Sequence, residues 1–136
     1  MQLNPYLMFK GDCEAAFKFY EKALGGKAEI MMHYEDSPAA DHVPPEWRSK
    51  IMHARLTVGD HVLMGSDPPP AQQDSMKGFS VTLSVSEAAE ADRIFNALAE
   101  NGSIKMPIGE TFWALRFGML VDRFGTPWMI NCEKPM

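Results

Sequence analysis

The sequence has few of the features that mark secreted or membrane proteins. Only two of its 136 residues are cysteines, Cys13 and Cys132, and the first residues lack the basic start and long apolar run of a secretory signal. Two such thiols are expected to be free and buried rather than joined in a disulfide. No run approaches the roughly 18 apolar residues of a membrane-spanning helix. We therefore expect a cytoplasmic protein with no membrane partner.

Positive charge is also scarce, because 13 Lys and Arg stand against 18 Asp and Glu and leave a net charge of -5. Proteins that bind nucleic acids usually present a basic face, so this balance argues against a nucleic-acid partner. The sequence contains no G-x-G-x-x-G turn, no G-x-x-x-x-G-K-[ST] loop and no G-x-S-x-G element. It therefore carries no motif for dinucleotide binding, phosphate-loop chemistry or serine hydrolysis.

Two segments have the apolar spacing of amphipathic helices, from about Asp12 to Leu24 and from about Glu87 to Glu100. In each segment the apolar residues recur at intervals of three and four and form one stripe. The stripes are Cys13, Ala16, Phe17, Tyr20 and Leu24 in the first helix and Ala88, Ala91, Phe95 and Leu98 in the second. The expected caps and stops are Asp12 with Gly25-Gly26, and Ser86 with Asn101-Gly102.

One predicted strand precedes each helix and three follow it, as short apolar or alternating runs bounded by turn residues. The expected strands are Leu3–Phe9, Ala28–Tyr34, Ile51–Val58 and His61–Ser66, then Phe79–Val85, Ile104–Gly109, Ala114–Val121 and Trp128–Cys132. The chain therefore predicts an α+β fold made of two β-α-β-β-β modules. The alternative is a ferredoxin-like α+β domain with extra strands.

Single residues support the repeat. Phe19, Gly26 and Ile30 recur 76 positions later as Phe95, Gly102 and Met106. A Pro-rich linker from Pro68 to Gln73 separates the copies, and the first copy contains a long, mobile loop from Glu35 to Arg48. We expect one domain over residues 1–136, with module one at about 1–67 and module two at about 78–134.

Several motifs indicate a family. The first helix contains Phe19-Tyr20 and ends at Leu24-Gly25, and the last turn reads Asp122-Arg123-Phe124-Gly125. These segments resemble the FY-x-x-x-LG and D-P-x-G motifs of the glyoxalase/bleomycin resistance/dioxygenase, or vicinal oxygen chelate, superfamily, with Arg123 in place of proline. The segments from Glu110 to Ala114 and from Pro127 to Asn131 resemble its PhnB-like subgroup, often labelled a 3-demethylubiquinone-9 3-methyltransferase domain. The resemblance covers nearly the whole chain.

The resemblance implies a U-shaped, mixed eight-stranded sheet around a cleft. In the superfamily's enzymes, His, Glu or Asp residues on the first and last strands of each module bind a divalent metal that acts as a Lewis acid. Alignment places these four positions on Pro5, Met64, Ser80 and Met129. Proline, two thioethers and a neutral hydroxyl are poor ligands for such ions. We therefore expect neither the usual metal nor another cofactor, and a divalent metal is the alternative.

Strand alternation suggests a pocket. Between Phe79 and Val85 the apolar residues share one face, expected to pack on the helices, whereas the hydroxyl residues share the other. The expected ligand-binding residues are Met64, Ser80, Thr82, Trp113 and Met129. Such a set would suit a small, partly apolar molecule. The alternative is that these side chains only pack in the core.

Acid/base chemistry has three candidates, His53, Glu110 and Asp67. Each also has a structural interpretation: a core histidine, a solvated loop glutamate or a turn cap. Arg55 and Arg116 are candidates for holding an anionic ligand. If the chain is an enzyme, the resemblance favours a lyase, isomerase or thiol transferase. We also expect a homodimer, because relatives in the superfamily build their clefts from two chains and short open sheets have edges that pair.

Overall fold

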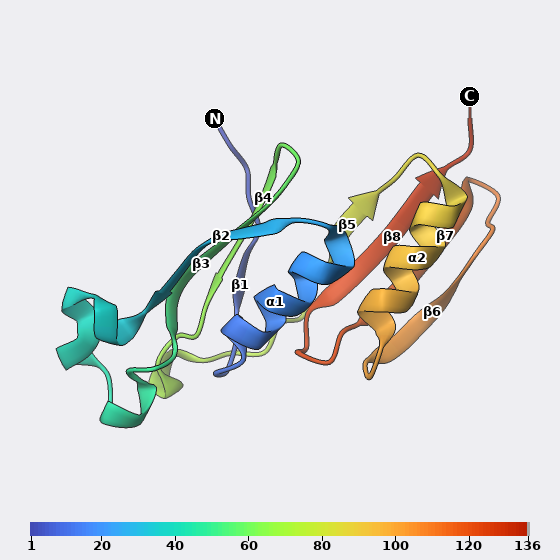
Figure 1. Cartoon of the computed structure of the whole chain (residues 1–136). Coiled ribbons are helices and arrows are strands. Elements are labelled where there is room, and N and C mark those ends of the chain that lie inside the picture. Colours follow the sequence, from blue (N-terminus) through green and yellow to red (C-terminus); the bar gives the residue numbers. More distant parts are fainter. Residues whose placement is uncertain (136) are drawn as a thin grey trace. The chain divides into compact units, whose positions relative to one another are not determined.

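The computed structural model describes residues 1–135, and Figure 1 traces its elements. The first set is β1 (Tyr6–Met8), α1 (Cys13–Leu24), β2 (Lys27–His33), β3 (Ile51–Val58) and β4 (His61–Ser66). The second is β5 (Val81–Ser84), α2 (Ala88–Ala99), β6 (Ser103–Gly109), β7 (Ala114–Val121) and β8 (Pro127–Glu133). The predicted α+β fold of two β-α-β-β-β modules is confirmed. The chain divides into two compact units, the second beginning at Met76.

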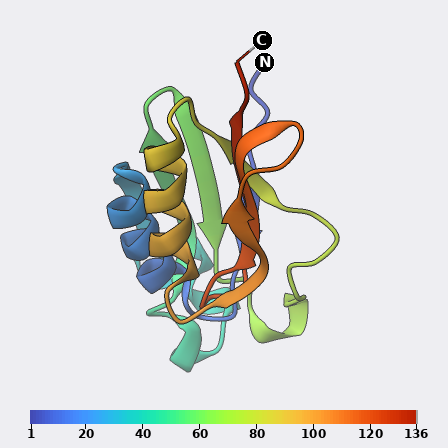
Figure 2. The same cartoon turned by 90° about the vertical axis from the view of Figure 1, so that its right-hand side faces the viewer.

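Each unit contains one four-stranded mixed sheet. The strand order is β1-β4-β3-β2 in the first unit and β5-β8-β7-β6 in the second, so corresponding strands occupy corresponding places. The first pair of each sheet is parallel and the other pairs are antiparallel. In each unit the helix covers one face of its own sheet (Figure 2). None of the helices in residues 1–135 is long and apolar enough to cross a membrane.

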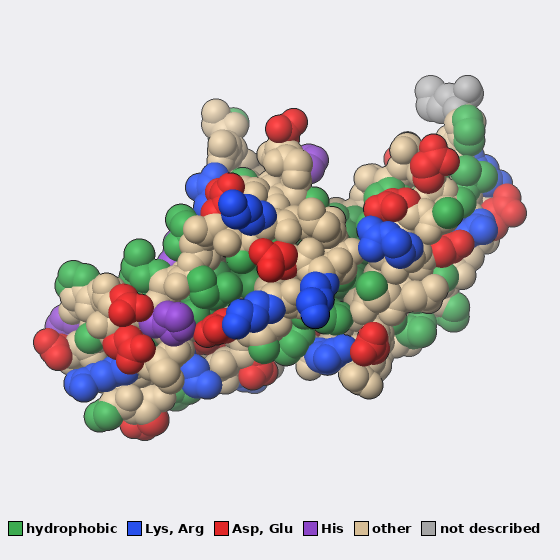
Figure 3. Space-filling view, in the orientation of Figure 1, with side chains coloured by type: hydrophobic (Ala, Val, Ile, Leu, Met, Phe, Trp, Pro, Cys, Tyr) green, Lys and Arg blue, Asp and Glu red, His purple; other side chains and the backbone are tan. Residues whose placement is uncertain are grey.

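The core of each unit lies between the helix and the sheet. The predicted stripe of α1 is buried except for Leu24, which is half-buried while Ala23 takes the inner place. The stripe of α2 is buried from Ala91 to Leu98 and also includes Ile94. On the surface around the helices, Lys and Arg alternate with Asp and Glu (Figure 3). This division of each helix surface is the pattern expected of amphipathic helices.

The predicted N-cap residue is correct for α1 but wrong for α2. Asp12 holds the N-cap position of α1 without a side-chain hydrogen bond, because the carboxylate of Asp67 binds the backbone at this helix start instead. The N-cap of α2 is Glu87 rather than Ser86, and it too makes no side-chain hydrogen bond. Local sequence identifies residues that favour caps but not a distant side chain that replaces them.

Some predicted segments are shorter or more ordered than expected. β1 covers only three residues of the predicted Leu3–Phe9 strand, and β5 omits both ends of Phe79–Val85. Phe79 is 46% exposed, so its predicted packing on a helix is wrong. The expected loop from Glu35 to Arg48 contains three short 3-10 helices, at Tyr34–Asp36, Pro38–His42 and Pro45–Trp47.

The internal repeat is clearest just after each helix. Gly25 and Asn101 both have left-handed backbone angles, with φ of 74° and 60°. At the next position, a Cβ on Gly26 would lie 2.6 Å from the Thr57 carbonyl oxygen, and one on Gly102 would lie 2.5 Å from that of Val121. Both glycines are therefore needed for close approach to the third strand of their module.

Within the helices the repeat is offset by 75 residues instead of 76. Phe95 matches the buried Tyr20, whereas Phe19, its predicted counterpart, is only half-buried. One extra residue, Glu100, lies between the end of α2 and its left-handed residue, which explains the one-residue difference.

Replacing Gly102 by alanine is expected to destabilise the protein by about 1–3 kcal/mol, because the added methyl group meets backbone that cannot move aside cheaply. Gly109→Ala is the matched control, since a Cβ there would meet nothing within 4 Å and the φ of Gly109 is not left-handed. We expect that variant to stay within about 0.5 kcal/mol of the parent. Urea denaturation measures both, and equal losses would contradict the close approach.

Candidate functional site

The first candidate surface is the face of the β1-β4-β3-β2 sheet that is turned away from α1, called the first open face. Its orientation follows from Gly65, where a Cβ would lie 2.9 Å from the ring of Phe17 on α1. Side chains alternate along a strand, so the neighbouring Met64 and Ser66 point to the opposite face. The predicted ligand-binding residue Met64 therefore lies on the first open face.

Neighbouring strands extend this surface. Met64 lies beside Tyr6 on β1 and Arg55 on β3, and Arg55 lies beside Ile30 on β2. One row of the sheet thus contains a phenol, a thioether, a guanidinium and an aliphatic group. Large apolar side chains of this face are between 36% and 51% exposed: Tyr6, Met8, Ile30 and Met32. The first open face combines exposed apolar groups with a cation at its centre.

His53 lies on the first open face, two residues from Arg55 on β3. Its Nδ1 is 3.2 Å from the Tyr6 hydroxyl oxygen, and the two rings stack with centroids 5.8 Å apart. One group of the pair donates a hydrogen bond to the other, according to the tautomer of the histidine. Tyr6 was not among the residues predicted from the sequence, because only the register between β1 and β4 brings it to this face.

Arg55 has no partner in the part of the chain that the structure describes. Its Nε is buried and makes no hydrogen bond to any described residue. Arg116 differs, because its Nε donates to Asp92 Oδ1 at 3.0 Å and its Nη1 donates to the Leu115 carbonyl at 2.7 Å. Arg116 is therefore already paired with Asp92 on α2. Binding an anion stays a prediction for Arg55 alone.

The second candidate surface is the face of the β5-β8-β7-β6 sheet that is turned away from α2, called the second open face. A Cβ on Gly118 would lie 2.7 Å from the ring of Phe95 on α2, so Met119 points to the opposite face. Met119 lies beside Met129 and Met106, and Met129 lies beside Thr82. Two predicted ligand-binding residues, Thr82 and Met129, are thus adjacent on this face.

Asn131 is a further polar residue of the second open face, and it was not predicted from the sequence. It lies beside Phe117 and Ser84 on the neighbouring strands. Its Oδ1 is buried and accepts no hydrogen bond from residues 1–135. Because Asn131 is two residues from Met129, strand alternation would have predicted that it lies on this face. The sequence gives no sign that its Oδ1 is buried without a hydrogen bond from a described residue.

The remaining predicted ligand-binding residues lie near this face. The ring of Trp113 is 44% exposed and packs edge-on against Phe117 with centroids 5.4 Å apart. Ser80 is half-buried and precedes the paired part of β5.

The strand register shows which residues lie beside the positions that the family alignment assigns to metal ligands. Met64 is paired with Tyr6 rather than Pro5, and Met129 is paired with Thr82 rather than Ser80. Phenol, hydroxyl and thioether groups are poor ligands for hard divalent ions. Within residues 1–135, no three or more His, Cys, Asp or Glu side chains are grouped to hold a metal ion.

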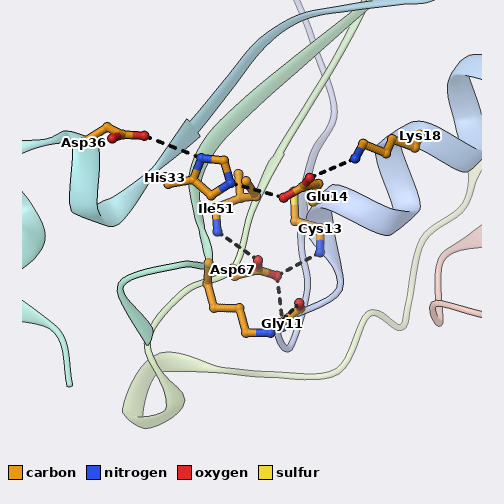
Figure 4. A network of polar contacts seen from close by, with 9 residues as sticks. Gly11, Cys13, Glu14, Lys18, His33, Asp36, Ile51 and Asp67 are labelled. Atoms are coloured by element: carbon orange, nitrogen blue, oxygen red, sulfur yellow. Dashed lines mark hydrogen bonds and ion pairs between the residues drawn. The ribbon is translucent and has the colours of Figure 1, made fainter. Parts of the chain in front are cut away.

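Asp67 serves as an anchor for the first unit (Figure 4). The side chain is buried, and its Oδ1 accepts hydrogen bonds from the backbone N–H groups of Gly11 and Cys13 at 2.9 and 3.0 Å. Its Oδ2 accepts one from the Ile51 N–H at 3.0 Å. The carboxylate of this predicted acid/base residue is thus engaged by backbone donors at the starts of α1 and β3.

Glu110 is more exposed than its sequence context predicts. Its side chain is 63% exposed, and its Oε2 lies 3.2 Å from the Lys134 ammonium. It belongs to the second unit, whereas His53 and Asp67 belong to the first. A partly buried glutamate beside the aromatic residues is therefore the wrong description of this position.

Charged groups at the start of α1 form a second network, also drawn in Figure 4. Hydrogen bonds from Lys18 and then His33 lower the pKa of the Glu14 carboxyl. His33 reaches Glu14 through Nε2 at 3.1 Å and Asp36 through Nδ1 at 3.5 Å. This cluster connects α1 to the end of β2, and its carboxylates are already occupied by cations and the imidazole.

Cys13 is excluded as a nucleophile. Burial, and then the negative charge of Asp67, raise the pKa of its thiol far above the usual range. A thiol must lose its proton to attack, so the predicted free and buried cysteine is unreactive at neutral pH. Cys132 is likewise free and buried.

Known proteins share this architecture. The Glyoxalase/Bleomycin resistance protein/Dioxygenase superfamily profile matches residues 2–130. Protein YjdN of Escherichia coli (strain K12) is 36% identical over an alignment of 142 positions, which covers 98% of this chain and 97% of YjdN. The crystal structure of protein PA1353 from Pseudomonas aeruginosa has a TM-score of 0.91 and 52% identity over 99% of both chains. A PhnB protein from Bacillus cereus, provisionally called a 3-demethylubiquinone-9 3-methyltransferase, has a TM-score of 0.81 and 25% identity over 97% of this chain and 99% of its own.

Asp67→Asn is expected to lower the free energy of unfolding by about 3 kcal/mol or more. The amide keeps one acceptor oxygen, and its NH2 group would face a backbone N–H group that now donates to a carboxylate oxygen. Asp60→Asn, at an exposed position between β3 and β4, is the matched control and should stay within about 0.5 kcal/mol. Chemical denaturation compares the two. A loss no larger than that of the control would show that the anchor contributes little.

Proposed function

Because the chain belongs to the glyoxalase/bleomycin resistance protein/dioxygenase superfamily, we propose that this PhnB-like protein binds a small, partly apolar molecule on the open faces of its sheets, without the usual superfamily metal. One observation carries the proposal. Each open face combines large apolar side chains with one buried polar atom that has no partner within residues 1–135, Arg55 Nε on the first and Asn131 Oδ1 on the second.

The chemistry of these faces supports a ligand. Buried polar atoms in native proteins nearly always have hydrogen-bond partners, so these two atoms are suited to pair with polar groups of a bound molecule. The first face offers a donor at Arg55 and the second an acceptor at Asn131. Methionine recurs on both faces, and its flexible thioether adapts to ligands of irregular shape. These properties fit a molecule with an apolar body and a few polar groups.

Two activities suggested by relatives receive less support. The residues beside Met64 and Met129 are Tyr6 and Thr82, which give no carboxylate or imidazole for a divalent metal. The methyltransferase activity in the name of the Bacillus cereus protein finds no support in this sequence, which lacks a Gly-rich strand-to-helix turn for a methyl-donor nucleotide.

Acid/base catalysis at the Tyr6–His53 pair is the second candidate. The imidazole lies on the first open face at 3.2 Å from a hydroxyl that can exchange a proton with it. Such a base would suit the lyase, isomerase or thiol-transferase reactions that the family resemblance favours if the chain is an enzyme. Asp67 would not transfer protons in this scheme, because both oxygens of its carboxylate accept hydrogen bonds from backbone N–H groups. It would instead hold the backbone at the starts of α1 and β3.

We further propose that the protein is a cytoplasmic homodimer. The edge strands β1, β2, β5 and β6 leave backbone groups available for pairing. Two exposed aromatic side chains also lie just before β7, where Phe112 is 89% exposed and Trp113 is 44% exposed. Apolar groups of this kind usually mark surfaces that another molecule covers.

The binding proposal is tested with N-phenyl-1-naphthylamine, a neutral probe that fluoresces when it leaves water. Met64→Gln and Met129→Gln should each weaken binding about three- to tenfold, because each removes roughly 1 kcal/mol of apolar contact. Leu3→Gln, at an almost fully exposed leucine, is the control and should bind as the parent does. The affinity should not change with a chelator or with added Zn²⁺ or Mn²⁺. Absence of binding, or binding that requires a divalent ion, would refute the proposal.

For the homodimer, multi-angle light scattering should report twice the 15.2 kDa chain mass at micromolar concentrations. Phe112→Ser should shift the equilibrium toward monomer if the exposed aromatic group lies in the interface. A single monomer mass for the parent protein over the whole concentration range would contradict the dimer.

A further inference from the structure

Arg55 is the exception among the chain's arginines. The sequence has five, and in the structure each of the other four lies within 4.0 Å of a carboxylate oxygen, in the pairs Arg48–Asp41, Arg93–Glu90, Arg116–Asp92 and Arg123–Glu100. The exposed pairs show that guanidinium groups in this chain readily find carboxylates. Arg55 alone has no such partner within residues 1–135, and it is also the arginine with a buried, unpaired Nε.

The position of Arg55 makes this lack of a partner costly. It lies on β3, between β4 and β2, so its cross-strand neighbours are Met64 and Ile30. The residue is half-buried, and its Nε is the part without solvent. Apolar flanks keep water from this atom, and a buried donor without a partner is unfavourable. An oxyanion that binds at Arg55 would remove this cost.

We infer that the molecule bound on the first open face is a small organic acid, whose oxyanion pairs with Arg55 and whose apolar body covers Met64. This inference rests on the proposed binding function and names its ligand class. A guanidinium matches the two oxygens of a carboxylate or phosphate through parallel N–H groups. The negative charge of the acid would complement the positive charge of Arg55. The side chains closest to Arg55 in register, Ile30 and Met64, are apolar and suit the apolar body of the acid.

The sheet also sets the size of the acid. Tyr6, Met64 and Arg55 occupy one row over three neighbouring strands. His53, which stacks on Tyr6, stands two residues from Arg55 on β3. Residues two apart on a strand lie about 7 Å from each other, so the stacked rings lie beside the guanidinium. An acid with a body no longer than a fused two-ring group therefore contacts both. The Tyr6–His53 pair then bounds the apolar end of the ligand and offers one polar contact there.

The test compares probes that share one apolar body. 2-Naphthoate carries a carboxylate, 2-naphthamide is its neutral analogue, and 2-naphthyl phosphate carries the other oxyanion. In titration calorimetry the parent protein should bind at least one oxyanion about tenfold or more tightly than the amide, as expected for a charge-assisted hydrogen-bonded pair. Whether the carboxylate or the phosphate binds more tightly identifies which oxyanion the face accepts.

Arg55→Met keeps the length of the side chain and should reduce the preference for oxyanions to about one, while amide binding is retained. Arg93→Met, on the exposed side of α2, removes the same charge elsewhere and should leave the preference unchanged. Arg55→Lys keeps the charge without the planar fork and should give an intermediate preference. It also supplies the test if Arg55→Met fails to fold by circular dichroism.

Equal binding of the oxyanions and the amide to the parent protein would overturn the inference and leave the proposed binding function intact. A preference that survives both Arg55 substitutions would overturn it as well, because the anion would then bind elsewhere or another group would cover Arg55. If none of the three probes binds, both the inference and the proposed function fail.

Discussion

The carboxylate of Asp67 holds the first module together at the point where its helix and two of its strands meet. It binds backbone N–H groups at the starts of α1 and β3, while its own carbonyl accepts hydrogen bonds from the Tyr34 hydroxyl at 2.8 Å and the Trp47 indole at 3.0 Å. One residue at the end of β4 therefore also orders the 3-10 segment that follows β2. A charged carboxylate can be buried at this position because both of its oxygens accept hydrogen bonds from backbone donors.

The two sides of each sheet differ in what they contain. The side that faces the helix contains the packed core and, in the first module, the helix start bound by Asp67. The open face is free of these demands, so it can contain groups that the fold does not need, such as the unpaired Arg55 and the exposed Met32. The residues that build the fold are thus separate from those that face outward on the open faces.

Local patterns predicted most of the fold. The three- and four-residue spacing of apolar groups located both helices, and β3, β4 and β7 begin and end at the predicted residues. Interactions between distant residues were not predictable in this way. Asp67 replaced the expected cap at Asp12, and the role of Tyr6 depended on a parallel register that no local pattern encodes. The choice of Met64, Thr82 and Met129 placed all three on open faces, because strand alternation is a local property; whether they bind a ligand stays a prediction.

Within the described residues, the start of α2 has no equivalent of this anchor, although the buried Asp122 carboxylate accepts backbone hydrogen bonds from Phe124 and Thr126 at the turn after β7. Matching hydrogen bonds, from Phe9 N to the Ser66 carbonyl and from Val85 N to the Asn131 carbonyl, place Cys132 where the first module has Asp67. A buried thiol cannot accept three backbone hydrogen bonds, and the start of α2 has no side-chain cap. Two copies that share one fold have therefore diverged in how firmly their helices begin. Because no side chain binds the start of α2, local opening is expected to cost less there than at the start of α1, where Asp67 binds the backbone.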